Sequence, residues 1–312
     1  MLSRRLLRTK VLKALYARLK SESANDAAAV KNLMMSVDKA YELYVHVMNL
    51  IVCVKNYAEE RQEIALHKQL PTYEDLNPNR RFVENCVVRL IEQSESVKEF
   101  SKAHKLSWHD CPELIKTLYN QLVSADYFKA YMSAEKCSFR DDVRVVEEFF
   151  KNEPDNCEML EEVLEEQSLM WRDDLNSALI MVLRTLSNVR RSTTEITLLP
   201  KFKNEDDADF TRTLFTETLD SYDESLKIVE RFASNWDLER IAFMDNLIMA
   251  MAMTELRCFP SIPVKVTLDE YIEISKYYST ANSGQFINGV LDKVVEEFTA
   301  DGRISKSGTG LL

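Results

Sequence analysis

The chain has 312 residues, 46% of them hydrophobic, which is enough for one large core or two smaller ones. Only five residues are glycine, and none precedes Gly284, so most of the chain lacks both tight hairpin turns and the glycine-rich loops of nucleotide-binding and hydrolase sites. A net charge of −11 argues against a protein that coats nucleic acid over its whole surface, and no apolar run is long enough to predict a membrane span. The composition therefore favours an all-α fold.

The first 20 residues are strongly basic. They carry seven basic side chains and no acidic one, so this segment has a charge of +7 and the rest of the chain −18. Apolar residues at helical spacing predict an amphipathic helix, with Arg4, Arg5 and Arg8 gathered at its start. The same pattern is also typical of an organelle transit peptide or of a solvated charged face.

The middle of the chain, residues 21–205, predicts a series of long helices. Asn25 is a suitable cap for an apolar stripe that continues to Pro71, and a bend or short break is expected because one unbroken helix would be roughly 65 Å long. Pro112 predicts another helix start. Residues 192–207 lose the helical periodicity and are the expected linker.

The same region offers no convincing catalytic or metal-binding pattern. Residues 141–174 are acidic, and Glu161, Glu162, Glu165 and Glu166 have a helical spacing that would suit a cation, although a solvated acidic face is favoured. None of the four histidines has the glutamate spacing of di-iron helices. The six cysteines show no paired short spacing, which favours reduced thiols in the cytoplasm. The sequence therefore predicts neither an enzyme nor a bound cofactor or metal.

Residues 235–295 predict three consecutive helices. The first is expected to start at Leu238 and to stop before Pro260, because proline cannot donate a backbone hydrogen bond. The second is expected to begin with a capping box formed by Thr267 and Glu270.

The third of these helices is expected after Ser283. Its broad apolar stripe includes Phe286, and Gly289 within it predicts the close approach of another backbone. Residues 301–312 are polar and contain glycine, so a disordered tail is expected.

The C-terminal residues resemble the NusB family of transcription antitermination proteins. The resemblance is carried by several groups of residues along these helices: Trp236, Leu238, Arg240, Ile241 and Asp245; Ala252, Thr254, Glu255 and Leu256; Ile262, Pro263, Val264 and Val266; and the run FINGVLDK at 286–293. The arginine pattern at the N-terminus, followed by Ala14, Leu15 and Tyr16, is similar to the first helix of the family and favours that interpretation over a transit peptide.

The resemblance implies a division of the chain. Residues 1–20 would be the first helix of a NusB-like core, 21–205 a helical insertion, 206–300 the C-terminal bundle, and 301–312 a disordered tail. Such a protein is all-α, with NusB-like helical bundles and a large all-helical insertion.

The resemblance also implies a function. The chain would be a cytoplasmic, non-enzymatic factor that pairs with the ribosomal protein NusE and binds boxA-like single-stranded RNA in the RNA polymerase antitermination complex. It would thereby sustain transcription of ribosomal RNA operons. An alternative interpretation is a protein–protein adaptor, in which the insertion binds proteins and RNA binding is reduced or lost.

The resemblance assigns two sets of residues. The expected RNA-binding residues, with the arginines near the loop at 280–285, are Arg4, Arg5, Arg8, Tyr16, Asn282, Gln285 and Phe286. The expected NusE-binding residues are Leu238, Arg240 and Asp245. Alternatives stay open for three of them: Tyr16 and Phe286 would equally suit the core, and Asp245 would equally suit an ion pair inside the fold.

Overall fold

The computed structural model describes residues 1–22, 25–204, 206–233 and 241–306. Every regular element within these ranges is a helix, and none of these residues forms a β-strand, which confirms the all-α prediction. The chain divides into two compact units. Unit 1 comprises residues 1–2 and 38–201, and unit 2 comprises residues 3–37 and 202–312.

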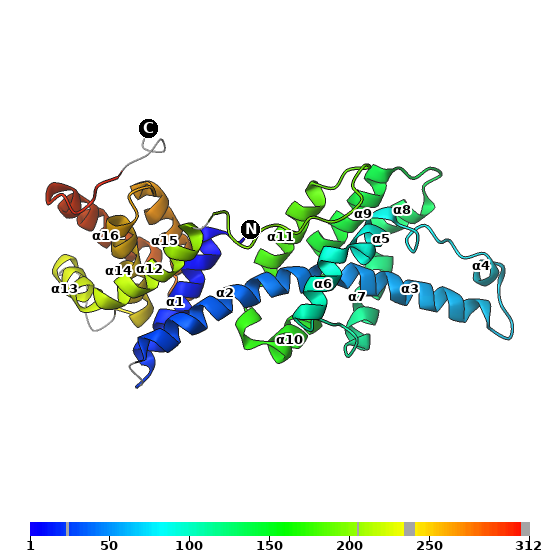
Figure 1. Ribbon diagram of the computed structural model, residues 1–312, viewed down its shortest axis with the longest axis horizontal. Helices are drawn as coiled ribbons and strands as arrows, with labels where there is room; N and C mark the ends of the chain where they lie inside the picture. Colours follow the sequence, from blue (N-terminus) through cyan, green and yellow to red (C-terminus); the bar gives the residue numbers. More distant parts are fainter. Residues whose placement is uncertain (23–24, 205, 234–240, 307–312) are drawn as a thin grey trace. The chain divides into compact units, whose positions relative to one another are not determined.

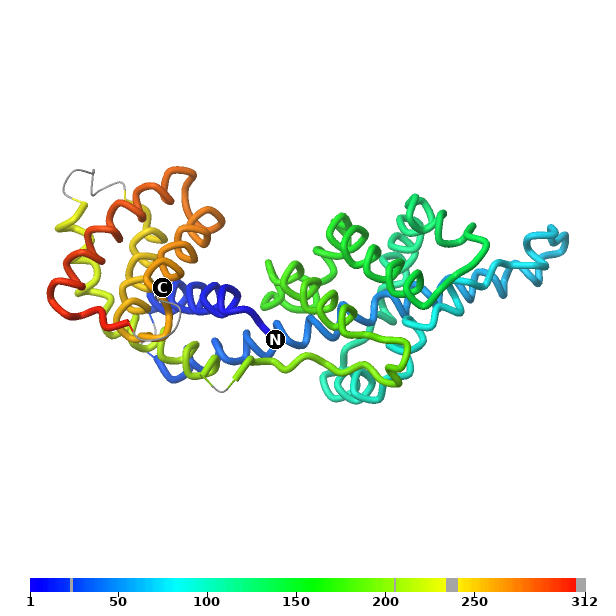
Figure 2. The backbone as a smooth tube through the Cα atoms, turned by 90° about the horizontal axis from the view of Figure 1, so that it is seen from above, coloured from blue at the N-terminus to red at the C-terminus, as the bar shows by residue number. Residues whose placement is uncertain are grey.

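Unit 2 brings the N-terminal helix together with the C-terminal ones (Figure 1). Its elements are α1 (Arg4–Lys20), the first half of α2 (Asp26–Met48), α12 (Asp206–Asp220), α13 (Tyr222–Phe232), α14 (Phe243–Cys258), α15 (Val264–Tyr278) and α16 (Ser283–Ala300). Leu7, Val11, Leu12 and Leu15 of α1 are fully buried, and α1, drawn in blue in Figure 2, packs on α12 and α14. The expected docking of the first helix on the C-terminal bundle is therefore confirmed.

Unit 1 is a separate helical body with its own core. After the second half of α2 it contains α3 (Leu50–Leu66), α4 (Tyr73–Leu76), α5 (Cys86–Gln93), α6 (Glu95–Ala103), α7 (Pro112–Ser124), α8 (Asp126–Ser133), α9 (Phe139–Asn152), α10 (Glu158–Gln167), a 3-10 turn (Leu169–Trp171) and α11 (Leu175–Ser187). Within it, α3 packs on α5 and α7, and α9 packs on α5, α8 and α11.

Local sequence explains many of the helix ends. The side chain of Asn25 accepts a hydrogen bond from the backbone N–H of Ala28, as expected for a cap at the start of α2. The predicted break in the long helical stripe falls at Asn49, between α2 and α3. Pro112 is the first residue of α7, where its missing N–H costs nothing.

Two helix starts in unit 2 differ from the predictions. The helix α14 begins at Phe243 rather than Leu238, and Leu238 lies outside the described residues. The helix α15 begins at Val264, directly after Pro263, so Thr267 does not cap it. Thr267 is buried and donates a hydrogen bond from its hydroxyl to Glu255 at 2.9 Å.

Two further expectations differ from the described part of the structure. Among the described residues, no atom of a neighbouring element lies within 4 Å of the position where a side chain on Gly289 would begin, so none of their backbone approaches there. Residues 301–306, expected to start a disordered tail, fold back on unit 2. The Arg303 guanidinium lies 4.0 Å from the ring centre of Phe298, and Lys306 donates to the carbonyl of Phe259 at 3.0 Å.

The predicted linker is packed on unit 1 over part of its length. The Tyr41 hydroxyl donates to the carbonyl of Leu199 at 2.6 Å, and the Ser96 hydroxyl donates to the carbonyl of Ile196 at 2.9 Å. Because Ile196 is itself buried, these residues form part of the fold of unit 1.

Candidate nucleic-acid interface

The start of α1 presents two arginines that are held by acidic side chains. Arg4 Nε donates to Asp207 at 2.9 Å, and Arg5 donates to both oxygens of Glu270 at 2.9 Å each. The hydrogen bond to Glu270 raises the pKa of Arg5, although partial burial opposes it. The Arg5 side chain is still 53% exposed, so it can meet a ligand.

Arg8, the third predicted arginine, is buried. Its guanidinium donates to both oxygens of Glu255 at 2.7 and 2.8 Å, and Glu255 is fully buried. Glu255 also accepts hydrogen bonds from Thr267 and Tyr271. Burial opposes the charge on Arg8, yet the hydrogen bonds to Glu255 raise its pKa. Arg8 therefore holds the bundle together and does not face a ligand.

The other end of α1 carries an exposed aromatic and basic cluster. Tyr16 is 44% exposed, and its ring packs edge-on against Phe243, with ring centres 5.6 Å apart. Lys20 Nζ lies 4.1 Å from the centre of the Phe243 ring, and Lys13 Nζ lies 5.7 Å from that of Tyr278. An exposed aromatic beside basic side chains is the combination that binds single-stranded nucleic acid.

The loop before α16 supplies two further predicted residues. Asn282 and Gln285 are exposed, whereas Phe286 is buried at 5% exposure and belongs to the core. Asp245 anchors the two ends of this loop, because it accepts hydrogen bonds from the hydroxyls of Ser279 at 2.5 Å and Ser283 at 3.0 Å.

The prediction that Arg4, Arg5 and Arg8 lie near the loop at 280–285 is wrong. Arg5 contacts Glu270 near the middle of α15, and Lys13 contacts Tyr278 at its end, so the loop lies nearer the second half of α1. Twelve residues separate Arg4 from Tyr16, which places them about 18 Å apart along the helix. Lys13 and Lys20 lie about one helical turn to either side of the exposed Tyr16, and sequence reasoning missed both.

Of the three residues expected to bind NusE, Leu238 and Arg240 lie outside the described residues. Asp245 is buried at 5% exposure and bonded to two serines, so it holds the loop before α16 instead of facing solvent. Among the described residues, the partners of Asp245 are these hydroxyl groups and not the base of an ion pair.

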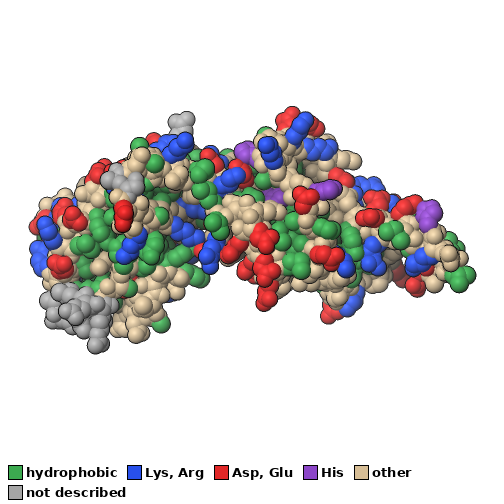
Figure 3. All heavy atoms as spheres, turned by 90° about the horizontal axis from the view of Figure 1, so that it is seen from below, with side chains coloured by type: hydrophobic (Ala, Val, Ile, Leu, Met, Phe, Trp, Pro, Cys, Tyr) green, Lys and Arg blue, Asp and Glu red, His purple; other side chains and the backbone are tan. Residues whose placement is uncertain are grey.

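The described residues offer neither a metal site nor a membrane span. No group of three or more His, Cys, Asp and Glu side chains among them is placed to hold a metal ion. None of the described helices combines the length and the apolar character needed to cross a bilayer. In Figure 3, basic and acidic side chains are interspersed over the visible face, with no broad basic area.

Comparison with known proteins identifies the C-terminal region. The NusB family profile matches residues 177–296. Proteins named "Transcription antitermination protein NusB" are similar to this chain in Salinibacter ruber (46% identity over 104 residues), Chloroherpeton thalassium (40% over 84) and Pseudothermotoga lettingae (42% over 96). No solved structure matches the chain significantly.

The similarity is confined to part of each protein. It covers 33%, 27% and 30% of this chain and 65%, 40% and 66% of the three relatives, which is less than two thirds of each. The matched region includes the described helices α12, α13 and α14, all of α15, and most of α16, and it also includes α11, which lies in unit 1. Residues 177–296 of the chain are therefore similar to the NusB family.

Proposed function

We propose that the chain is a non-enzymatic transcription antitermination factor that acts in the cytoplasm. It binds boxA-like single-stranded RNA together with the ribosomal protein NusE, within the RNA polymerase antitermination complex. The observation that carries the proposal is the identity of 40–46% to proteins named for transcription antitermination. The exposed basic and aromatic side chains of α1 support it independently.

The proposed RNA-binding surface consists of those predicted RNA-binding residues that are exposed, together with Lys13 and Lys20. Tyr16 stacks on an unpaired base, and Lys13 and Lys20 bind the flanking phosphates. Asn282 and Gln285 hydrogen-bond base edges from the neighbouring loop. Arg5, at the other end of α1, binds a more distant phosphate, and Arg4 contributes through its exposed portion.

The NusE-binding surface is proposed at the start of α14 and the segment before it. Leu238 and Arg240 would contact the partner directly. Asp245 contributes indirectly, because it fixes the loop before α16 through Ser279 and Ser283. The acidic balance of the chain outside α1 suits a basic ribosomal protein.

Replacement of Arg5, Tyr16 and Lys20 by alanine tests the RNA site. All three side chains are exposed in whole or in large part, so the variant is expected to fold. Loss of two phosphate contacts should reduce the slope of log affinity against log salt by about 1.4, at about 0.7 per contact. Loss of one stacked base should weaken binding by at least about fivefold.

The matched control replaces Lys98, Lys102 and Lys105, three exposed lysines of unit 1, by alanine. Fluorescence anisotropy on a labelled boxA-like RNA measures both variants and the parent. If the parent binds the RNA and the α1 variant binds it with the same affinity and salt slope, this site is ruled out. Capture of other proteins without RNA would favour the adaptor interpretation.

A further inference from the structure

One face of unit 1 carries arginines that form no ion pair with a described acidic side chain, although the charges of Arg144 and Arg140 contribute, after the hydrogen bonds from Ser138, to the lowered pKa of Asp141. Arg140 and Arg144 are one helical turn apart on α9, both are exposed, and neither makes a side-chain hydrogen bond or ion pair within the described part of the chain. Arg190 follows α11, is exposed, and donates to the carbonyls of Ser187 at 2.6 Å and Val189 at 3.0 Å. Residues 38–201 contain 21 basic and 29 acidic side chains, a net charge of −8, so this group stands out from the unit that carries it.

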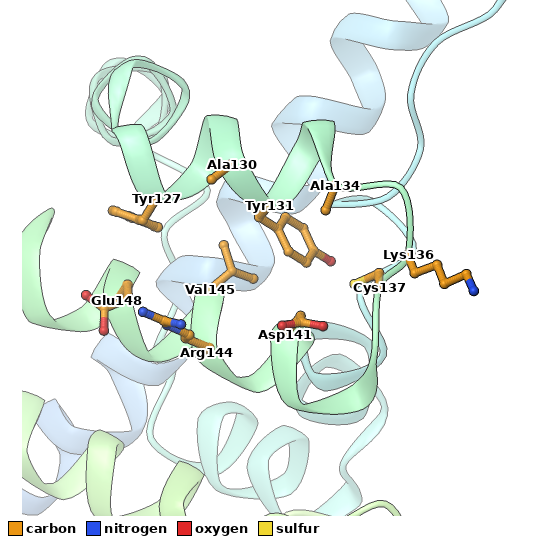
Figure 4. A pocket seen from close by; sticks show the side chains of 10 residues that line it. All are labelled: Tyr127, Ala130, Tyr131, Ala134, Lys136, Cys137, Asp141, Arg144, Val145 and Glu148. Atoms are coloured by element: carbon orange, nitrogen blue, oxygen red, sulfur yellow. The ribbon is translucent and has the colours of Figure 1, made fainter.

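Two pockets flank these arginines. One, of about 260 Å³, lies between α8 and α9 and is lined by Tyr127, Tyr131, Arg144 and Val145 (Figure 4). The other, of about 560 Å³, lies between α9 and the end of α11 and is lined by both basic and apolar side chains. Its lining includes Phe139, Arg140, Val143, Arg144, Leu186 and Arg190. Arg144 lines both pockets, so they form one surface, which we call the α9 strip.

The tyrosine rings of the α9 strip are fixed in place. The Tyr127 hydroxyl donates to Glu153 at 2.5 Å, and the Tyr131 hydroxyl donates to Asp142 at 2.7 Å. Because their polar ends are satisfied, the rings present apolar surface to the pocket at little cost in side-chain entropy. Tyr131 is largely buried, whereas Tyr127 is partly exposed, so Tyr127 is the ring that a ligand can reach.

The acidic residues of the α9 strip do not cancel its charge. Glu148 pairs with Lys151 at 3.0 Å, and Asp141 is held by the backbone and hydroxyl of Ser138 in a capping box. Five basic side chains line the two pockets against three acidic ones, a net charge of +2; the basic set is Lys136, Arg140, Arg144, Lys151 and Arg190. The strip therefore attracts an anionic ligand although unit 1 as a whole repels one.

We infer that the α9 strip is a second binding surface for single-stranded RNA. Phosphates lie on Arg140, Arg144 and Arg190, and an unpaired base packs against the Tyr127 ring. Planar guanidinium groups match phosphate oxygens, and every base offers a face for stacking, so the surface would hold RNA with little dependence on sequence. This inference rests on the proposed function, because it extends the RNA that the chain holds beyond the α1 site.

The test uses the full chain and a single-stranded RNA of about 30 nucleotides that contains a boxA-like segment. Arg140, Arg144 and Arg190 are replaced together by alanine, and the control is the Lys98, Lys102 and Lys105 triple variant. We expect the arginine variant to lose at least about tenfold in affinity at low salt and its salt slope to fall by about 2, at 0.7 per contact. The control should keep the parent slope within about half a unit, because its lysines lie off the strip.

A second pair of variants separates stacking from charge. Tyr127→Leu removes the ring, whereas Tyr127→Phe keeps it and loses only the hydrogen bond to Glu153. We expect Leu to weaken RNA binding about fivefold or more and Phe to leave it within about twofold of the parent. Circular dichroism and thermal unfolding establish that each variant is folded.

The outcomes distinguish this inference from the proposed function. If the parent binds no single-stranded RNA, the proposed function fails and the α9 strip fails with it. If the parent binds, and the triple arginine variant keeps the parent affinity and salt slope, the α9 strip is not an RNA surface while the α1 site stands. An equal loss in the lysine control would also overturn it, because the effect would then come from net charge alone.

Discussion

Arg8 and Glu255 form the most deeply buried ion pair described in unit 2. Their two parallel hydrogen bonds join α1 to α14, and Thr267 and Tyr271 of α15 complete the partners of the carboxylate. Sequence reasoning assigned Arg8 to RNA binding together with Arg4 and Arg5. Three arginines close together on one helix cannot be divided into buried and exposed ones without their tertiary contacts. Its partner lies 247 positions away, so no local pattern could have separated Arg8 from Arg5.

Removal of one partner of this pair should be costly. We expect Glu255→Ala to lower the free energy of unfolding by about 3 to 5 kcal/mol, because it removes both close hydrogen bonds of the buried Arg8 and leaves it with the more distant carboxylate of Glu270, at 3.5 Å. Arg5→Ala, which removes an exposed ion pair, should cost less than about 1 kcal/mol. Urea unfolding of both variants measures the difference, and similar losses in the two would contradict the assignment of Arg8 to the core.

His46 gives unit 1 a dependence on pH. The ring stacks on Trp108 with centres 3.8 Å apart and shares a hydrogen bond with Gln167, while its Nδ1 is buried without a partner. Burial lowers the pKa of His46 to about 4, although the hydrogen bond to Gln167 opposes the shift. The folded protein therefore holds a neutral imidazole at pH values where the unfolded chain binds a proton.

The sign of the effect follows from that difference. Stability should be constant above pH about 7 and should fall as the pH drops from about 6.5 toward 4, by about 3 kcal/mol in total. His46→Gln should remove this dependence between pH 6.5 and 5, whereas His67→Gln, at a position with a 75% exposed side chain, should keep it. Chemical unfolding across that range is the measurement, and a flat parent profile would show that His46 is not responsible.

At the scale of elements, helical periodicity was enough to predict an all-α chain, and its proline and capping signals placed several boundaries. It predicted the cap at Asn25 and the start at Pro112 because those signals act within one helical turn. The proposed capping box at Thr267 failed because Pro263 starts α15 one turn earlier and because the Thr267 hydroxyl bonds to Glu255 on another helix. Local signals therefore mark helix ends only where no tertiary contact competes.

The loop before α16 depends on Asp245. We expect Asp245→Ala to lower the melting temperature and to cost about 1 to 3 kcal/mol, because Ser279 and Ser283 lose a buried acceptor. Lysine at this position should cost at least as much, whereas a residue that only contacted a partner would tolerate the change with little loss of stability. Asp292→Ala is a suitable control, since exposed Asp292 bonds only to Asn288 on its own helix. A melting temperature for Asp245→Ala equal to that of the control would show that the serine contacts do not support the loop.

At the scale of the whole molecule, residues 177–296 match the NusB family and residues 38–201 form a helical unit, so the two ranges share residues 177–201. The resemblance was visible in sequence because the helix joints and the run at 286–293 are local. The division into units could be predicted only in part from the sequence. The first half of α2 and residues 202–205 belong to unit 2, and their composition does not indicate this. The α9 strip was not predicted, since its arginines and tyrosines come from α8, α9 and the segment after α11, whose packing cannot be read from spacing.

The central claim is that this chain binds RNA as a NusB-type factor together with NusE. The most direct measurement is the affinity of the full chain for a boxA-like single-stranded RNA, with and without purified NusE, over a range of salt concentrations. We predict that the chain binds the RNA and that NusE tightens the binding. Replacement of Arg5, Tyr16 and Lys20 should weaken the binding both with and without NusE. The claim is contradicted if the chain binds no RNA in the presence of NusE, or if NusE leaves the affinity unchanged.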